Sequence, residues 1–197
     1  VIDEIVAVDT LKHRVETVAG SYPYDQLIVA TGVGLAPGEI PGLLEGWQKV
    51  AFDFYTLEGA VNLQKAMREF KGGKLVLNIA EFPFKCPVAP LEFVYLADAY
   101  FTERGLRDQV EIRLVTPLPG AFTKPKASAF FSRLIEEKNI KITASYDLVE
   151  VDCANKRIIS AGDQVIDFDL LVSIPPNVGA RYLVSSGVAM DEVGYVK

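Results

Sequence analysis

The sequence is poor in the residues that build metal sites and disulfide frameworks. Its 197 residues include two cysteines, Cys86 and Cys153, and one histidine, His13. Two separated cysteines do not make a disulfide framework. With a single histidine they also argue against the four-ligand set of a structural zinc site. We therefore expect no metal centre.

Positive charge and long hydrophobic runs are also scarce. The chain has 20 Lys and Arg against 26 Asp and Glu, a formal net charge of −6. Nucleic-acid binding needs clustered positive charge, so no nucleic acid is expected as a partner. The apolar runs have strand length or are interrupted by charge, so we expect no membrane-spanning helix, and no signal peptide is visible. Half of the residues are nevertheless hydrophobic, which is enough for a substantial core.

Residues 1–46 read as short antiparallel strands followed by a connector. The segments "EIVAVD", "RVETVAG" and "DQLIVAT" predict three strands, the last ending at Gly32, and glycines and prolines then predict a loop up to Gly46. The chain begins on "VIDEIVAVD" without an initiator Met and ends on "GYVK". Both ends read as strand, so we expect a piece of a longer protein.

Residues 47–176 predict an α/β domain. Thr56 is the expected N-cap of a helix over 57–70, and buried strands and helices then alternate up to "IKITAS". A β-meander and a last buried strand, "DLLVSIPP", follow. Repeated β-α-β units imply right-handed crossovers and a parallel sheet. We therefore predict a three-layer β/β/α Rossmann-like domain, with residues 177–197 as a return linker.

The loops that would bind a dinucleotide phosphate lack the expected glycines. The spacing of Gly32, Gly34 and Gly38 does not fit G-x-G-x-x-G, and two prolines in the same stretch block the helix that should follow. After the strand "KLVLNIA" no glycine occurs until Gly105, and the segment 82–84 (Phe-Pro-Phe) prevents close approach of a pyrophosphate. The domain thus has a nucleotide-binding plan that is disabled for the nucleotide.

Cys86 stands in the loop where those glycines would be. It lies just before a predicted helix whose first turn accommodates Pro90, and both the helix end and Lys85 favour a thiolate. A buried structural cysteine is the alternative interpretation. Glu92, six residues later, is either a cap of free N–H groups or a general acid/base above the thiol.

The remaining reactive residues have ordinary interpretations. Cys153 lies in a polar turn of the meander and is expected to be an incidental, half-buried thiol. His13 is expected in a turn. The segment 124–126 (Lys-Pro-Lys) reads as a solvated loop rather than an anion site.

Two segments together resemble a known family. "YDQLIVATG" (24–32) is similar to the strand and turn that join the two dinucleotide domains of flavoproteins. "FKCPVAPLE" (84–92) resembles the redox-cysteine loop of sulfide:quinone oxidoreductases and of the flavoprotein subunit of flavocytochrome c sulfide dehydrogenases. "RGLRDQVEIRLVTP" and "LLVSIPPNVGARYLVSSGVA" fit the same family, so the resemblance extends along essentially the whole chain.

The resemblance implies an FAD-dependent fold and a site. Cys86 would be one cysteine of a pair that takes up sulfide sulfur at the flavin, and Glu92 would match a carboxylate proposed as acid/base. Backbone of Ala30, Thr31 and Gly32 would pass the flavin, and residues 1–46 would carry strands of the flavin domain. Electrons would go to a quinone or a cytochrome, and the parent protein would be peripheral to a membrane.

The sequence also departs from the family pattern. The FAD phosphate loop, the partner cysteine and the membrane-anchoring segments of the family have no counterpart in these 197 residues, and a further cysteine of some members is replaced near Phe52. We therefore expect the chain alone to be inactive and to retain no FAD. A type-II NADH:quinone oxidoreductase and a non-catalytic interaction module are the alternatives. The apolar helix over 91–104 and the edge of the "VIDEIVAVD" strand further predict self-association.

Overall fold

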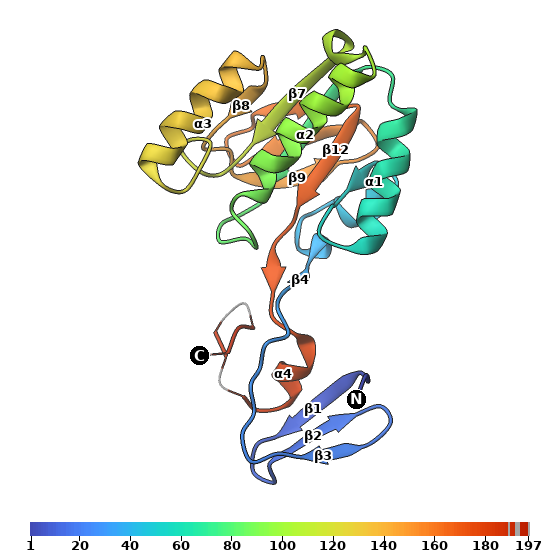
Figure 1. Cartoon of the computed structure of the whole chain (residues 1–197), viewed down its shortest axis with the longest axis vertical. Helices are drawn as coiled ribbons and strands as arrows, with labels where there is room; N and C mark the ends of the chain where they lie inside the picture. The colour runs from blue at the N-terminus through green and yellow to red at the C-terminus, as the bar shows by residue number, and fades with distance from the viewer. Residues whose placement is uncertain (189, 192–193, 197) are drawn as a thin grey trace. The chain divides into compact units, whose positions relative to one another are not determined.

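The computed structural model describes residues 1–188, 190–191 and 194–196, and the chain divides into two compact units. The larger unit comprises Ala36–Pro176, and the smaller comprises Val1–Leu35 with Asn177–Lys197. Figure 1 shows the elements that each unit contains. The larger unit carries the predicted α/β domain, and its architecture positions the candidate site.

A five-stranded parallel sheet forms the middle layer of the larger unit. Its strands run in the order β5-β12-β6-β7-β8. β6 and β12 are nearly devoid of polar alternation, as expected when both faces are covered. The bounds are Ala51–Phe52 for β5, Gly73–Ile79 for β6, Val110–Val115 for β7, Lys141–Thr143 for β8 and Leu170–Ile174 for β12.

Three helices cover one face of this sheet (Figure 1). They are α1 (Leu57–Glu69), α2 (Ala89–Glu103) and α3 (Pro125–Glu137). The Thr56 side chain accepts the N–H of Gly59 at the start of α1, so the predicted N-cap is confirmed. Gly105, with a φ of +67°, follows the end of α2, as expected for a left-handed residue at a helix terminus. A core of buried side chains, among them Leu77, Val94 and Phe101, lies between helices and sheet.

A β-meander covers the other face and completes the predicted three layers. It consists of β9 (Leu148–Asp152), β10 (Arg157–Ser160) and β11 (Val165–Asp167), all antiparallel. Val151 and Ile158 from the meander pack with Val76 and Leu171 from the sheet in a second core. Three short 3-10 helices, η1 (Pro37–Glu39), η2 (Leu44–Gly46) and η3 (Arg107–Gln109), complete the unit. The predicted α/β Rossmann-like class is confirmed.

The smaller unit contains an antiparallel sheet of β1 (Ile5–Asp9), β2 (Arg14–Thr17) and β3 (Ser21–Pro23). It also contains β4 (Gly34–Leu35) paired with β13 (Asn177–Val178), and the short helix α4 (Arg181–Ser185). The described part of the segment 177–197, expected as a linker, therefore contains β13 and α4. Val196 forms an isolated bridge with Met190 near the predicted C-terminal strand, whose last residue, Lys197, lies outside the described residues.

One predicted strand of the smaller unit is wrong. The segment "DQLIVAT" (25–31) forms no strand, and the third antiparallel strand is Ser21–Pro23 instead. A strand requires a neighbour for its backbone hydrogen bonds, and no described strand pairs with this segment. The segment instead leaves apolar side chains in solvent, since Ile28 is 88% exposed and Leu27 is 37% exposed.

The central position of α2 explains its unusually apolar sequence. Phe93 stacks on Phe54, which precedes α1, at 5.2 Å between ring centroids. On the opposite flank, the Tyr95 hydroxyl donates to the carbonyl of Phe131 in α3 at 3.4 Å. The expectation that a second face of this helix lacks a partner is therefore mostly wrong, because α1 and α3 cover its flanks. Leu96, at 69% exposure, remains open to solvent. Among the described helices, none has the length and hydrophobicity needed to cross a membrane.

Candidate functional site

The loop between β6 and α2 holds Cys86 at the carboxyl edge of the parallel sheet. In open α/β sheets this edge is where ligands bind. Phe84 anchors the loop, because its ring is buried in the helix-side core. Phe82 packs edge-to-face on Phe84 with ring centroids 6.2 Å apart and is 54% exposed. Cys86 itself is exposed, which excludes the alternative of a buried structural cysteine.

The backbone of Cys86 has an uncommon conformation. Its φ is +58°, in the left-handed region that non-glycine residues seldom occupy. Its carbonyl accepts the N–H of Ala89 at 3.0 Å. The N-cap of α2 is Val88, and Pro90 lies in the first turn as predicted. Cys86 thus precedes the positive end of a 15-residue helix by two positions.

Tyr55, from the turn between β5 and α1, contacts the Cys86 loop. Its hydroxyl donates to the backbone carbonyl of Lys85 at 2.5 Å. The Lys85 ammonium lies 5.9 Å from the centroid of the Tyr55 ring. Burial raises the pKa of Tyr55 far above its ordinary value, and the negative charge of a Cys86 thiolate raises it further. Tyr55 therefore remains a protonated hydrogen-bond donor throughout the physiological pH range.

A buried carboxylate holds the turn that carries Tyr55. Asp53 is 1% exposed, and its side chain accepts the N–H groups of Tyr55 at 2.8 Å and of Thr56 at 2.7 Å. Gln48 Nε2 donates to the same carboxylate at 2.8 Å. The space is tight, since a Cβ at Gly59 would lie 2.1 Å from Asp53 Oδ2. The turn is therefore fixed by hydrogen bonds from three neighbours.

Glu92 lies in the first turn of α2 and is exposed. Its backbone N–H donates to the Val88 carbonyl at 3.0 Å. Within the described part of the chain, no hydrogen bond or ion pair involves its carboxylate. The capping role considered from the sequence is therefore not observed among the described residues. Glu92 and Cys86 lie at the same end of α2.

Ala30, Thr31 and Gly32 belong to the smaller unit, whereas Cys86 and Glu92 belong to the larger. All three are exposed and lie outside regular elements. Gly32 has a φ of +69°, and a Cβ built there meets nothing within 4 Å. Gly32 is therefore an exposed backbone position without a side chain. The glycine-rich segment that follows enters β4 and a three-residue 3-10 helix, so it provides no α-helix end for a phosphate.

The residues that the sequence analysis placed outside the site have ordinary surroundings in the structure. Cys153 is half-buried and its thiol donates to the Gly42 carbonyl at 3.2 Å. Burial raises the pKa of the Cys153 thiol, although a hydrogen bond from the Gly46 backbone opposes the shift. His13 lies in a turn and stacks on Tyr24 at 5.4 Å. Lys124 and Lys126 are exposed around the start of α3. No three His, Cys, Asp or Glu side chains gather as a metal site among the described residues.

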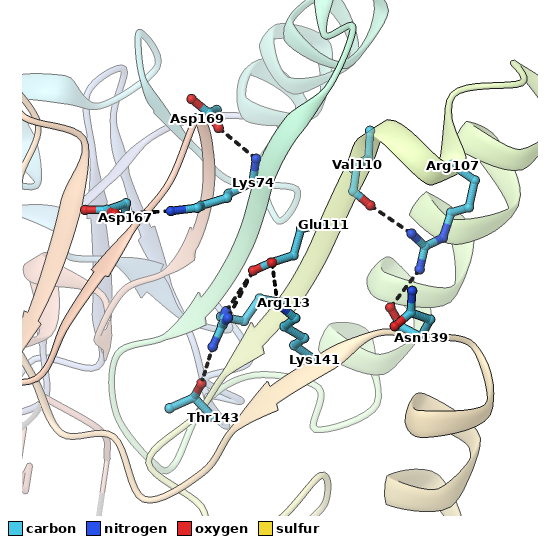
Figure 2. Close-up of polar contacts among 10 residues, drawn as sticks. All are labelled: Lys74, Arg107, Val110, Glu111, Arg113, Asn139, Lys141, Thr143, Asp167 and Asp169. Carbon is cyan, nitrogen blue, oxygen red and sulfur yellow. Dashed lines mark hydrogen bonds and ion pairs between the residues drawn. The ribbon is translucent and has the colours of Figure 1, made fainter.

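A polar cleft of about 530 Å³ lies at the opposite edge of the sheet, where β6, β7 and β8 begin. Figure 2 shows the hydrogen bonds and ion pairs of the Lys and Arg residues there. Lys74 pairs with Asp167 at 3.1 Å, and Lys141 pairs with Glu111. Arg107 donates to the carbonyl groups of Val110 and Asn139 at 2.8 and 3.0 Å. These charges tie strands and loops together, so they do not form an anion site.

The sequence did not reveal Tyr55 or Asp53 as parts of the site. Asp53 had a local signal, because an Asp three residues before a helix N-cap often bonds the turn. The bond from Tyr55 to Lys85 had none, since 30 positions separate these residues. Every residue carries a backbone carbonyl, so the residue type at position 85 gives no sign that a side chain donates to it.

No family model matches the chain, but known proteins do. It is 29% identical over 181 residues to the mitochondrial sulfide:quinone oxidoreductase of Mus musculus, covering 88% of this chain and 40% of that protein. It is 40% identical over 73 residues to an NADH dehydrogenase-like protein of Mycobacterium tuberculosis, covering 36% of this chain and 17% of that protein. The chain thus spans about two-fifths of the length of the first of these relatives.

The fold comparison gives a consistent result. The structure of the sulfide:quinone oxidoreductase from Aquifex aeolicus superimposes with a TM-score of 0.82 and 19% identity, over 95% of this chain and 44% of that one. The resemblance to sulfide:quinone oxidoreductases predicted from the Cys86 loop is therefore confirmed.

Proposed function

We propose that this chain is the central domain of an FAD-dependent sulfide:quinone oxidoreductase-like enzyme and that Cys86 handles sulfide sulfur there. The observation that carries the proposal is the similarity to the sulfide:quinone oxidoreductase of Mus musculus over 88% of the chain. The exposure of Cys86 at the carboxyl edge of the sheet supports it, because that edge is the usual ligand side of such folds.

Among the described residues, the segment 30–32 would meet a flavin through its backbone. The open space beside Gly32 suits a bulky group that passes the segment Ala30–Gly32. The described residues offer no glycine loop followed by a helix for the pyrophosphate, so that part of the cofactor would be held elsewhere in the whole protein. FAD, when bound, supplies the two-electron acceptor that oxidation of sulfide sulfur requires.

The roles of the two site residues follow from their surroundings. Cys86, exposed at the start of α2, presents a sulfur nucleophile at the carboxyl edge of the sheet. The Glu92 carboxylate, free of partners in the described chain, accepts or returns the proton of a sulfur species at the same helix end. We assign quinone as the electron acceptor on the basis of the relatives' names, with a cytochrome as the second possibility.

The test uses the full-length protein and compares two cysteine variants. Cys86→Ser should reduce sulfide-dependent reduction of a soluble quinone by at least about 100-fold, because the covalent route loses its nucleophile. Bound flavin, measured by absorbance, should be unchanged. Cys153→Ser is the matched control, since this thiol bonds Gly42 inside the larger unit, and it should keep its activity. Full sulfide oxidation by Cys86→Ser would overturn the proposal.

We also propose that the 197-residue chain by itself is inactive and retains no FAD. The pyrophosphate would contribute most of the affinity through a glycine loop and helix end, which the described residues do not provide. The purified chain should therefore be colourless and should not reduce quinone with sulfide. A yellow preparation with stoichiometric flavin would contradict this.

A second candidate is an NADH dehydrogenase-like function. It is favoured by the 40% identity to the Mycobacterium tuberculosis protein, although that match extends over 73 residues. NADH binding separates the two candidates, because the loop after β6 has no glycine at which a pyrophosphate could approach the backbone.

A further inference from the structure

We propose that Tyr55 is a positioning residue for Cys86, and that its hydroxyl holds the peptide plane that precedes the cysteine. The inference rests on the proposed function, because orientation of this thiol matters only if Cys86 reacts. Its structural part stands separately and can be tested without sulfide.

The argument begins with the planarity of the peptide group. The Lys85 carbonyl oxygen and the Cys86 N–H belong to one rigid plane. The Tyr55 hydroxyl donates to that oxygen at 2.5 Å, so it fixes the orientation of the plane. The plane on the other side of Cys86 is fixed as well, because the Cys86 carbonyl accepts the Ala89 N–H at 3.0 Å. Two held planes leave the Cα of Cys86 little freedom between them.

The backbone conformation of Cys86 requires such restraint. A φ of +58° is disfavoured for a residue with a Cβ, and such a conformation persists where the surroundings hold it. The carbonyl bond from Ala89 belongs to the entry of α2 and acts on one side alone. Tyr55 acts on the other side from outside the loop, through the Lys85 carbonyl. We infer that without it Cys86 leaves the left-handed region and the thiol moves relative to the end of α2.

Tyr55 is itself well anchored, as a positioning residue must be. Its N–H donates to the buried Asp53, and its ring stacks on Phe54 with centroids 4.9 Å apart. Phe54 in turn stacks on Phe93, one residue after Glu92 in α2. The ring is thus fixed to both the β5–α1 turn and the helix that Cys86 precedes. The hydroxyl of Tyr55 is the group that donates a hydrogen bond to the Cys86 loop.

The test removes that hydroxyl in this chain. Tyr55→Phe keeps the ring, and Tyr95→Phe is the matched control, since Tyr95 also donates to a backbone carbonyl, that of Phe131, away from the loop. Two quantities are measured for Cys86: its ¹³Cα and ¹³Cβ chemical shifts, which report a left-handed backbone, and its alkylation rate by iodoacetamide against pH. Thermal unfolding checks that both variants fold.

In Tyr55→Phe, the Cys86 shifts should move toward those of an ordinary extended or helical residue. Alkylation near neutral pH should slow by about threefold or more, the size expected when the sulfur loses contact with a helix end. Tyr95→Phe should leave the shifts and the alkylation rate unchanged. Lys85→Ala, which keeps the backbone carbonyl, should leave the shifts unchanged too.

Unchanged shifts and an unchanged alkylation rate in Tyr55→Phe would overturn the inference, as would a Lys85→Ala variant that alone moves Cys86. These readouts do not depend on sulfide oxidation. If Cys86→Ser kept full activity, the proposed function would fail while the effect of Tyr55 on Cys86 remained measurable.

Discussion

The carboxylate of Asp98 accepts a hydrogen bond from Arg107 Nε at 2.6 Å, and both side chains are largely withdrawn from solvent. Asp98 projects from α2, and Lys138 at the end of α3 donates to its other oxygen at 2.8 Å. Arg107 also donates to the carbonyl groups of Lys138 and Asn139. The ion pair therefore joins α2 to the end of α3 and to the start of β7.

Replacement of Asp98 by Asn should destabilise the chain. The substitution leaves Arg107 partly buried without its counter-charge, and breaking such a pair on one side costs about 2–3 kcal/mol of unfolding free energy. Glu137→Gln is the matched control, because Glu137 pairs with Arg133 at 3.5 Å while both are well exposed. It should change stability by no more than about 0.5 kcal/mol. Equal losses in urea unfolding for the two variants would contradict the prediction.

The same carboxylate predicts how stability depends on pH. Burial raises the pKa of Asp98, but hydrogen bonds from Lys138 and Arg107 outweigh it and hold the pKa below its ordinary value of 3.8. Because the folded pKa is depressed, the contribution is complete above the ordinary value and is lost as pH falls through the folded pKa. The stability gap between the wild type and Asp98→Asn should therefore be widest at neutral pH and narrow toward acid. Urea unfolding at several pH values measures it, and a gap independent of pH would be contrary to expectation.

Much of the fold could be predicted because its signals are local. The buried, unalternated strands and the helices between them gave the parallel sheet, and Thr56 and Gly105 marked helix ends by their residue types. The segment 25–31 failed because a strand depends on a neighbour, which the pattern of one segment does not reveal. The second apolar side of α2 was misassigned for a similar reason: only tertiary structure places α1 and α3 beside it.

For the candidate site, the sequence located Cys86 and Glu92 at the start of a helix through the prolines around them. Their roles remain predictions. The support of Cys86 by Tyr55 required the structure, because the hydrogen bond joins residues 30 positions apart and ends on a backbone atom. The left-handed conformation of Cys86 was equally invisible, since a non-glycine residue gives no sign of it.

The two cysteines of the chain should differ in reactivity. Cys86 is exposed, whereas Cys153 is half-buried and its thiol pKa is raised by burial, with the negative charges of Glu45 and Asp152 adding to the shift. Since the thiolate is the nucleophile, alkylation near pH 7.5 should favour Cys86 by about tenfold or more. The ratio should decrease as pH rises through the pKa of Cys153. Peptide mapping after a short iodoacetamide pulse measures it, and equal rates at pH 7.5 would argue against a reactive Cys86.

NADH should not bind this chain with measurable affinity. The loop after β6 contains no glycine, and Pro87 and Pro90 remove backbone donors near the start of α2. Phe84 is buried in the core, so it anchors the loop, and the exposed Phe82 obstructs the approach of a pyrophosphate. Fluorescence titration up to about 1 mM, roughly the limit for weak ligands, should give no saturable signal. Saturation at micromolar NADH would favour the NADH dehydrogenase-like candidate instead.

The isolated chain should self-associate. The structure indicates a different contact surface from the helix predicted from the sequence. The helix proposed from the sequence exposes mainly Leu96, because α1 and α3 cover its flanks. The segment after β3 has a stronger cause: Ile28 is 88% exposed and has no strand partner among the described residues, and unpaired apolar backbone favours association between copies. Light scattering should therefore give a mass above that of one chain. Ile28→Glu should lower it toward the monomer, whereas Leu96→Glu, the matched change on α2, should not. A monomeric wild type would contradict self-association altogether. If Leu96→Glu alone lowered the mass, α2 would be the contact surface instead.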